Sequence, residues 1–217
     1  MRRGRSSAIM HTMKKKIRVG FDFDGVVAYN PFRLVRSPWA FFKRRFLGIR
    51  KLTFFYPRSS WQKMVWRIMH DSSIYPAKGI DLFRKITKAE IIEAHLVTGR
   101  FNFLDDHLYR WLDKYNLKNL FKTINLNKHD EQPHLFKEKI MNKYNLDVFI
   151  EDNWDIVEYL HKKQKTKNKK QTKIYWIYNL LDRHRSHPHK FPYLEKALEE
   201  IIKSEELKGL SVKHEKY

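Results

Sequence analysis

Two aspartates, Asp22 and Asp24, stand two residues apart in residues 21–24, where the other two residues are phenylalanine. The apolar residues before them predict a buried strand, and Gly25 lets the backbone turn sharply just after the pair. Buried carboxylates are unfavourable unless they are paired or bind a cation, and oxygen ligands suit Mg²⁺. The pair therefore indicates a magnesium site, although an ordinary Asp-Gly turn is the alternative from these residues alone.

Strands that alternate with helices along the chain predict a parallel sheet that is covered on both faces, a Rossmann-like α/β/α fold. We expect five strands, near residues 17–23, 91–97, 121–126, 147–150 and 174–178. In such a sheet, ligands bind beyond the carboxyl ends of the strands. The chemistry is therefore expected at that edge.

Polar side chains follow three of the expected strands. Asp22 and Asp24 end the first, Thr98 ends the second, and Glu151 and Asp152 end the fourth. The Thr98 hydroxyl and its neighbouring N–H groups could hold a phosphoryl oxygen, or Thr98 could simply cap a helix. We expect all five residues to converge on one crevice.

These residues resemble the motifs of the haloacid dehalogenase (HAD) superfamily. Residues 21–25 match its first motif, apolar-Asp-apolar-Asp-Gly, and Thr98 matches the second. The resemblance implies that Asp22 is the nucleophile and Asp24 the general acid/base. It also implies that Asp22, the backbone carbonyl of Asp24, and Asp152 of the fourth motif bind Mg²⁺.

The third HAD motif is a lysine on the helix before the fourth strand. Lys137 fits best because it lies near the start of that helix, fifteen positions before Asp152. Lys139 is the second choice, and Lys128 the third. A lysine here would neutralise charge on the nucleophile and on the phosphate.

The fourth motif carries Glu151 where Gly or Asp is more usual in the family. The pair Glu151-Asp152 is most similar to the 5′(3′)-deoxyribonucleotidase-like branch, and it leaves open which acid binds the metal directly. Glu151 and Asp155 are expected to make outer or water-mediated contacts to the ion. Gly99 and Arg100 follow Thr98 and are expected to contact substrate.

The resemblance implies a Mg²⁺-dependent phosphatase, a phosphomonoesterase that forms an aspartyl-phosphate intermediate. A small organic phosphate such as a nucleotide is the expected substrate. Nucleic-acid ends, sugar phosphates and lipid phosphates are alternatives, as is a non-catalytic, basic nucleic-acid-binding protein on the same fold.

The composition is strongly basic: the 217 residues include 45 Lys+Arg against 24 Asp+Glu, a net charge of +21. Such a surface attracts anions, so nucleic acid or an anionic membrane surface are possible partners. There is no cysteine, which excludes disulfides and thiolate metal sites. No apolar run reaches the roughly 20 residues that span a bilayer, and no signal peptide is evident, so a cytoplasmic location is expected.

Composition also divides the chain into segments. We expect a basic N-terminal arm at 1–16, a core formed by 17–28 and 78–207, and a polar tail at 208–217. Residues 29–77 are predicted to form a small helical cap inserted after the first strand, with helices near 39–47 and 60–70. The mixed basic and aromatic side chains of this cap could bind nucleic acid or lie on a membrane. We favour a cap whose aromatic residues pack inward.

Two further groups of polar residues have metal-ligating types but no firm spacing. They are His129, Asp130, Glu131 and His134, and then His184, His187 and His189. We expect both to be surface loops. Arg183 follows the last strand and could contact substrate.

Overall fold

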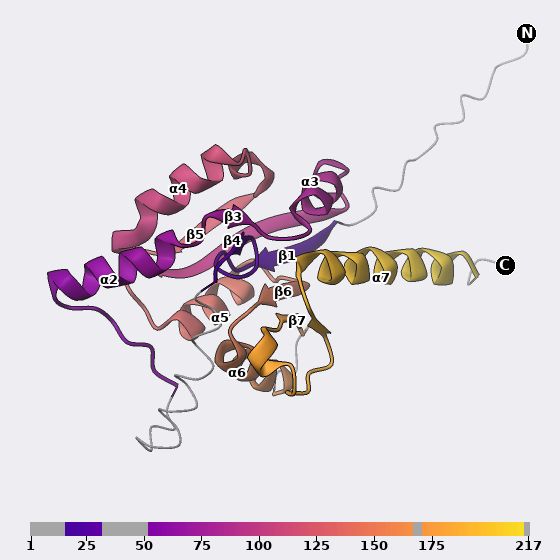
Figure 1. Cartoon of the computed structure of the whole chain (residues 1–217). Helices are drawn as coiled ribbons and strands as arrows, with labels where there is room; N and C mark the ends of the chain where they lie inside the picture. Colours follow the sequence, from indigo (N-terminus) through magenta and orange to yellow (C-terminus); the bar gives the residue numbers. More distant parts are fainter. Residues whose placement is uncertain (1–15, 32–51, 167–170, 215–217) are drawn as a thin grey trace, which may run out of the picture.

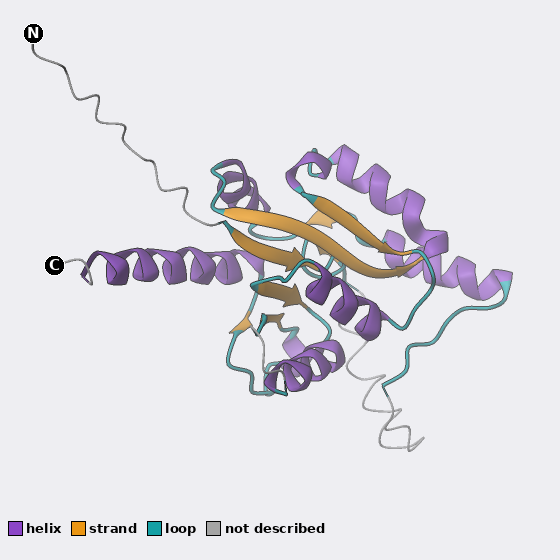
Figure 2. Ribbon diagram, turned by 180° about the vertical axis from the view of Figure 1, so that it is seen from behind, coloured by secondary structure: helices purple, strands orange, loops and turns teal. Residues whose placement is uncertain are grey.

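The computed structural model describes residues 16–31, 52–166 and 171–214, with the backbone alone for 205–214. Six parallel strands form one sheet in the order β5-β4-β1-β6-β7-β8 (Figures 1 and 2). They are β1 (Ile17–Phe21), β4 (Ile92–Phe101), β5 (Thr123–Asn127), β6 (Val148–Glu151), β7 (Lys173–Ile177) and β8 (Lys190–Phe191). The expected parallel α/β architecture is confirmed.

Helices cover both faces of this sheet and make three layers. One face packs against α3 (Ile80–Lys88), α4 (Asp105–Lys114) and α7 (Leu194–His214). The other face packs against α5 (Pro133–Lys143) and α6 (Trp154–Lys165). Single turns of 3₁₀-helix stand at Asn102–Leu104, Lys118–Leu120 and Leu180–Asp182.

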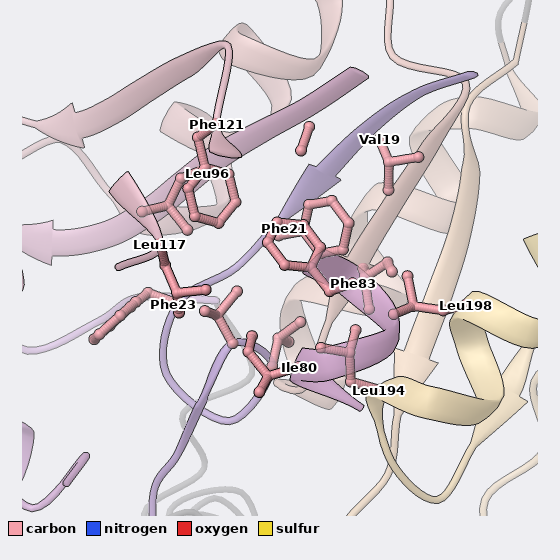
Figure 3. Packing of buried hydrophobic residues seen from close by; sticks show 14 of the residues in the cluster. Val19, Phe21, Phe23, Ile80, Phe83, Leu96, Leu117, Phe121, Leu194 and Leu198 are labelled. Carbon is pink, nitrogen blue, oxygen red and sulfur yellow. The ribbon is translucent and has the colours of Figure 1, made fainter. Parts of the chain in front are cut away.

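The central strand β1 shows how the core is divided between the two faces. Val19 and Phe21 point to the α3 side, where the Phe21 ring meets Phe83 edge-on at 5.1 Å (Figure 3). Gly20 lies on the other side, where an added Cβ would come within 2.5 Å of Leu146 and 2.6 Å of Phe149. The absence of a side chain at Gly20 therefore lets the layer of α5 and α6 pack closely on β1.

The elements differ from the prediction at three places. The sixth strand, β8, was not expected, because two residues are too short to show alternation. The second predicted strand continues beyond Thr98 to Phe101, with an irregular register after Thr98. Helix α7 runs on to His214, through most of the segment 208–217.

A two-stranded antiparallel ribbon brackets the segment that was predicted to form a cap. Its strands are β2 (Ala28–Tyr29) and β3 (Tyr75–Pro76). Between them lies α2 (Ser60–Asp71), which matches the helix predicted at 60–70, while the helix predicted at 39–47 lies outside the described residues. In the described part of the chain, no helix has the length and apolar character needed to cross a bilayer.

The expectation that the aromatic residues of this segment pack inward is wrong for four of the described ones. These are Tyr29 (49% exposed), Phe55 (54%), Trp61 (65%) and Tyr75 (65%). Helix α2 contains no buried residue.

Candidate active site

The register of the sheet brings the predicted residues to one edge. Phe21, the last residue of β1, pairs with Leu96 of β4 on one side and with Ile150 of β6 on the other. The next residues along the three strands, including Asp22 and Glu151, therefore emerge side by side at the carboxyl edge. The edge lies where ligands bind in parallel α/β sheets.

The turn after β1 fixes the direction of the first aspartate. The backbone N–H of Asp22 donates to the carbonyl of Ile150 at 3.0 Å, and the N–H of Phe23 donates to Asp22 Oδ1 at 2.8 Å. Gly25 has a φ of +83°, and an added Cβ there would lie 2.3 Å from Asp152 Oδ2. Gly25 is therefore needed both for its backbone conformation and for the close approach of Asp152.

Three buried carboxylates meet at this edge. Asp22, Glu151 and Asp152 each offer an oxygen that lies within 4.8 Å of the others. Within residues 16–31, 52–166 and 171–214, this is the one group of three or more potential metal ligands that lie this close together. The two sets of histidines and acids noted in the sequence do not form such a group.

Lys137, on α5, supplies the positive charge of this acidic group. Its Nζ lies 2.9 Å from Asp22 Oδ2 and donates to Glu151 Oε2 at 2.6 Å. By contrast, Lys139 pairs with Glu131 on the surface, where its side chain is 62% exposed. Of the lysines considered from the sequence, the structure thus brings Lys137 to the nucleophile candidate.

The electrostatics of the group follow from its burial. With three carboxylates and one ammonium, these four side chains carry excess negative charge when all are ionised. Burial, and then the charge of Glu151, raise the pKa of Asp22 well above its ordinary value, against the pull of Lys137. Burial alone would lower the pKa of Lys137, but Asp22 and Glu151 outweigh it and raise that pKa.

The donor set fits a small, hard cation. All the ligand atoms are carboxylate oxygens, which Mg²⁺ prefers, and an ion would offset their mutual repulsion. Both oxygens of Glu151 already accept hydrogen bonds, Oε2 from Lys137 and Oε1 from the backbone N–H of Asn153 at 3.0 Å.

Asp24 lies beside this group and has a different partner. Arg100 donates two hydrogen bonds to its carboxylate, from Nε to Oδ2 at 2.8 Å and from Nη2 to Oδ1 at 2.7 Å. Burial alone would raise the pKa of Asp24, but the charge and hydrogen bonds of Arg100 outweigh it and hold that pKa well below its ordinary value. Asp24 is ionised in this arrangement.

Arg100 also joins the sheet to helix α2. Its Nη2 donates to the carbonyl of His70, in the last turn of α2, at 2.9 Å. Its Nη1 lies 3.0 Å from His107 Nδ1. Burial, and then the charge of Arg100, lower the pKa of His107, so the imidazole is neutral and Nδ1 accepts this hydrogen bond.

The structure therefore gives Arg100 a different environment from the one predicted for a substrate ligand. Its side chain is 1% exposed, and its guanidinium faces protein groups rather than the surface. Thr98 is also buried, and its hydroxyl accepts from the backbone N–H of Arg100 at 3.2 Å. Gly99 packs on Pro133, whose Cβ would lie 2.8 Å from an added side chain.

Sequence reasoning missed the other partners of Asp24. Ser73 is fully buried, and its hydroxyl donates to Asp24 Oδ1 at 2.5 Å. Asn30 Nδ2 lies at the limit of a hydrogen bond to the same oxygen, at 3.5 Å. These residues flank the β2–β3 ribbon and match no motif, so only the tertiary structure reveals that they contact Asp24.

Asp155 lies in the first turn of α6, where its N–H donates to Asn153 Oδ1 at 3.0 Å.

Comparison with known proteins supports the fold. No protein-family model matches the sequence, and a sequence search of curated proteins finds no match. Solved structures do match. A protein of Thermotoga maritima assigned as a beta-phosphoglucomutase has a TM-score of 0.55 at 15% identity, over 86% of this chain and 99% of that one.

Two further solved structures are similar in the same way. The HAD hydrolase YfnB of Bacillus subtilis, bound to magnesium, has a TM-score of 0.52 at 11% identity, over 87% of this chain and 99% of that one. CbbY of Rhodobacter sphaeroides, in complex with phosphate, has a TM-score of 0.51 at 12% identity, over 83% and 96%. At such low identity these matches establish the architecture: the chain has the fold of the HAD-like hydrolases.

Proposed function

We propose that this protein is a Mg²⁺-dependent phosphomonoesterase that works through an aspartyl phosphate on Asp22. One observation carries the proposal: Asp22 is buried at the carboxyl edge of the sheet, in contact with Lys137 and within 4.8 Å of two further carboxylates. A structural salt bridge would not need this excess of buried acid. A site that binds a cation does need it.

The chain's own residues account for both halves of the reaction. An Asp22 oxygen attacks phosphorus and forms the acyl phosphate while the bond from phosphorus to the leaving oxygen breaks. Water then attacks the phosphorus of the intermediate, which releases inorganic phosphate and the Asp22 carboxylate. Lys137 holds Asp22 in place and, with Thr98, binds phosphoryl oxygens.

Mg²⁺ would be held by Asp22, Asp152 and the backbone carbonyl of Asp24, and when bound it would supply positive charge that offsets the repulsion between carboxylate and phosphate. Glu151 would act on the ion indirectly, because it holds Lys137. Asp155 is proposed as an outer contact.

Asp24 is the proposed general acid/base. In its ionised form it suits the second half-reaction, where it takes the proton of the attacking water. In the first half-reaction it must give a proton to the leaving oxygen, and the ion pair with Arg100 opposes protonation. We therefore propose that Arg100 withdraws from Asp24 when substrate binds, and that Arg100 and Gly99 then line the substrate pocket.

The substrate class is proposed from charge. A net charge of +21 favours an anionic organic phosphate, and a nucleotide would also use the aromatic side chains of the segment 29–77. The nucleotidase-like branch of the fold is the finer proposal, on the strength of the Glu151-Asp152 pair.

The direct test is release of phosphate from p-nitrophenyl phosphate with and without Mg²⁺, followed by a screen of nucleotides, sugar phosphates and lipid phosphates. We expect turnover that needs Mg²⁺ and is lost in Asp22→Asn. Asp113→Asn serves as the control, because it removes an exposed acid that pairs with Lys118 and lies outside the proposed site. Substantial turnover by Asp22→Asn would refute the assignment.

A further inference from the structure

Helix α2 turns an apolar stripe toward solvent. Four large apolar side chains on it are exposed: Trp61 (65%), Met64 (59%), Val65 (40%) and Ile68 (59%). Their spacing of three, one and three residues places them on one side of the helix. A surface helix normally turns such a side toward the core, so this stripe of Trp61, Met64, Val65 and Ile68 is the reverse of the usual arrangement.

The helix is held firmly with the stripe outward. Its N-terminus carries a capping box, in which Ser59 and Gln62 bind each other's backbone N–H groups. The side of α2 that carries Trp66 and Arg67 faces the rest of the molecule. Trp66 packs against Phe55, and Arg67 donates to the carbonyl of Phe103 at 3.1 Å. The outward stripe is therefore a feature of the packed structure and not of a frayed helix end.

The charge around the stripe indicates what covers it. Residues 52–77 contain three Lys and Arg residues and a single acid, Asp71. On and beside α2, the cations are Arg58, Lys63 and Arg67. A second copy of the chain on this side would bring like charges together, which opposes self-association.

Two anionic partners remain, nucleic acid and an anionic membrane. Nucleic acid would attract the cations and could stack on Trp61, but it offers no apolar volume for Met64, Val65 and Ile68. A bilayer with anionic headgroups offers both an apolar environment and negative charge. Its acyl chains accept the apolar side chains, and its headgroup phosphates attract the cations.

We propose that α2 docks this protein on an anionic membrane surface. The stripe enters the boundary between headgroups and acyl chains, and the positive charge of Arg58, Lys63 and Arg67 on and beside the helix attracts the anionic headgroups. Because Arg100 bonds the last turn of α2, docking also places the candidate active site close to the membrane. Docking goes beyond the proposed phosphatase activity and does not depend on it.

The test is co-sedimentation of the full chain with vesicles of phosphatidylcholine, with or without phosphatidylglycerol. We expect binding to the mixed vesicles only, and a loss of about tenfold or more in Trp61→Ser/Ile68→Ser. Arg58→Gln/Arg67→Gln should weaken binding and reduce its dependence on salt. The matched control is Leu135→Ser/Leu180→Ser, which removes side chains that are 47% and 65% exposed elsewhere and should bind as wild type.

Circular dichroism and urea denaturation report whether the variants are folded. If the wild type ignores mixed vesicles, or if both double serine variants lose binding equally, the stripe is not a membrane site. Light scattering that shows a dimer which Trp61→Ser/Ile68→Ser dissociates would assign the stripe to a second copy. Salt-sensitive binding to nucleic acid with no vesicle binding would also overturn the proposal.

Discussion

Arg100 binds the carboxylate of Asp24 through two hydrogen bonds, 2.8 Å from Nε to Oδ2 and 2.7 Å from Nη2 to Oδ1, although the two residues lie 76 positions apart in the chain. The guanidinium also lies over the Phe23 ring, 4.6 Å from its centroid. Asp24 follows β1, Arg100 lies near the end of the neighbouring strand β4, and both are buried. The pair joins the turn after β1 to the end of β4 and, through His70, to helix α2.

Removing one member of this pair should destabilise the protein. In Arg100→Gln the buried Asp24 loses its countercharge, and we expect the free energy of unfolding to fall by ~3–5 kcal/mol. Urea denaturation measures this. The double variant Arg100→Gln/Asp24→Asn should lose less than the sum of the single variants, because no unpaired charge remains. Strict additivity would show that the ion pair contributes little.

The same pair predicts a dependence of stability on acid. The pKa of Asp24 is lower in the folded state than its unfolded value of about 4. Its contribution to stability is thus present above about pH 4 and is lost as the pH falls from there toward the folded-state pKa. Between about pH 5 and pH 2, the wild type should lose more stability than Asp24→Asn. Parallel curves for the two proteins would contradict this.

Asp22 should show the opposite sign. Its pKa is raised in the folded state, so its charge opposes folding, and that cost appears as the pH rises above about 4. Asp22→Asn should therefore lower turnover by ~10³-fold or more while raising the Tm of the Mg²⁺-free protein at neutral pH. Each kcal/mol relieved is worth ~2–4 °C in a protein of this size.

Scanning calorimetry with and without Mg²⁺ completes the Asp22 test. Mg²⁺ should raise the Tm of the wild type, because it binds the folded state alone, and should raise that of Asp22→Asn less. If Mg²⁺ leaves the wild-type Tm unchanged at millimolar concentration, the three carboxylates do not form a magnesium site.

Lys137 and Lys139 give a matched pair of variants on one helix. Lys137→Met leaves Asp22 and Glu151 without the ammonium between them, so we expect a loss of ~3–5 kcal/mol in stability and ~10²-fold in turnover. Lys139→Met removes an exposed ion pair with Glu131, and it should cost ~1 kcal/mol or less, with turnover retained. Equal effects of the two substitutions would argue against the proposed role of Lys137.

The sequence alone determined five of the six strands of the main sheet and the helices between them, and it placed Asp22 directly after the first strand. Apolar runs such as residues 17–21 predict strands because their burial is a local pattern, and Asp22 must follow β1 wherever that strand lies. The short strand β8 escaped prediction because two residues hold no pattern, and Arg100 was expected after its strand because the irregular end of β4 is not visible in composition.

Only the tertiary structure decided which charged groups meet. With 45 Lys and Arg residues, the sequence ranked Lys137 ahead of Lys139 but left both open. The choice depends on which side of α5 is buried, and Phe136, Ile140 and Met141 place Lys137 on that side. Arg100 and Ser73 reach Asp24 across long stretches of chain, and α2 turns Trp61 outward. Such contacts depend on how the elements pack, because a pairwise distance between residues far apart in the chain is set by the whole fold and by no local pattern.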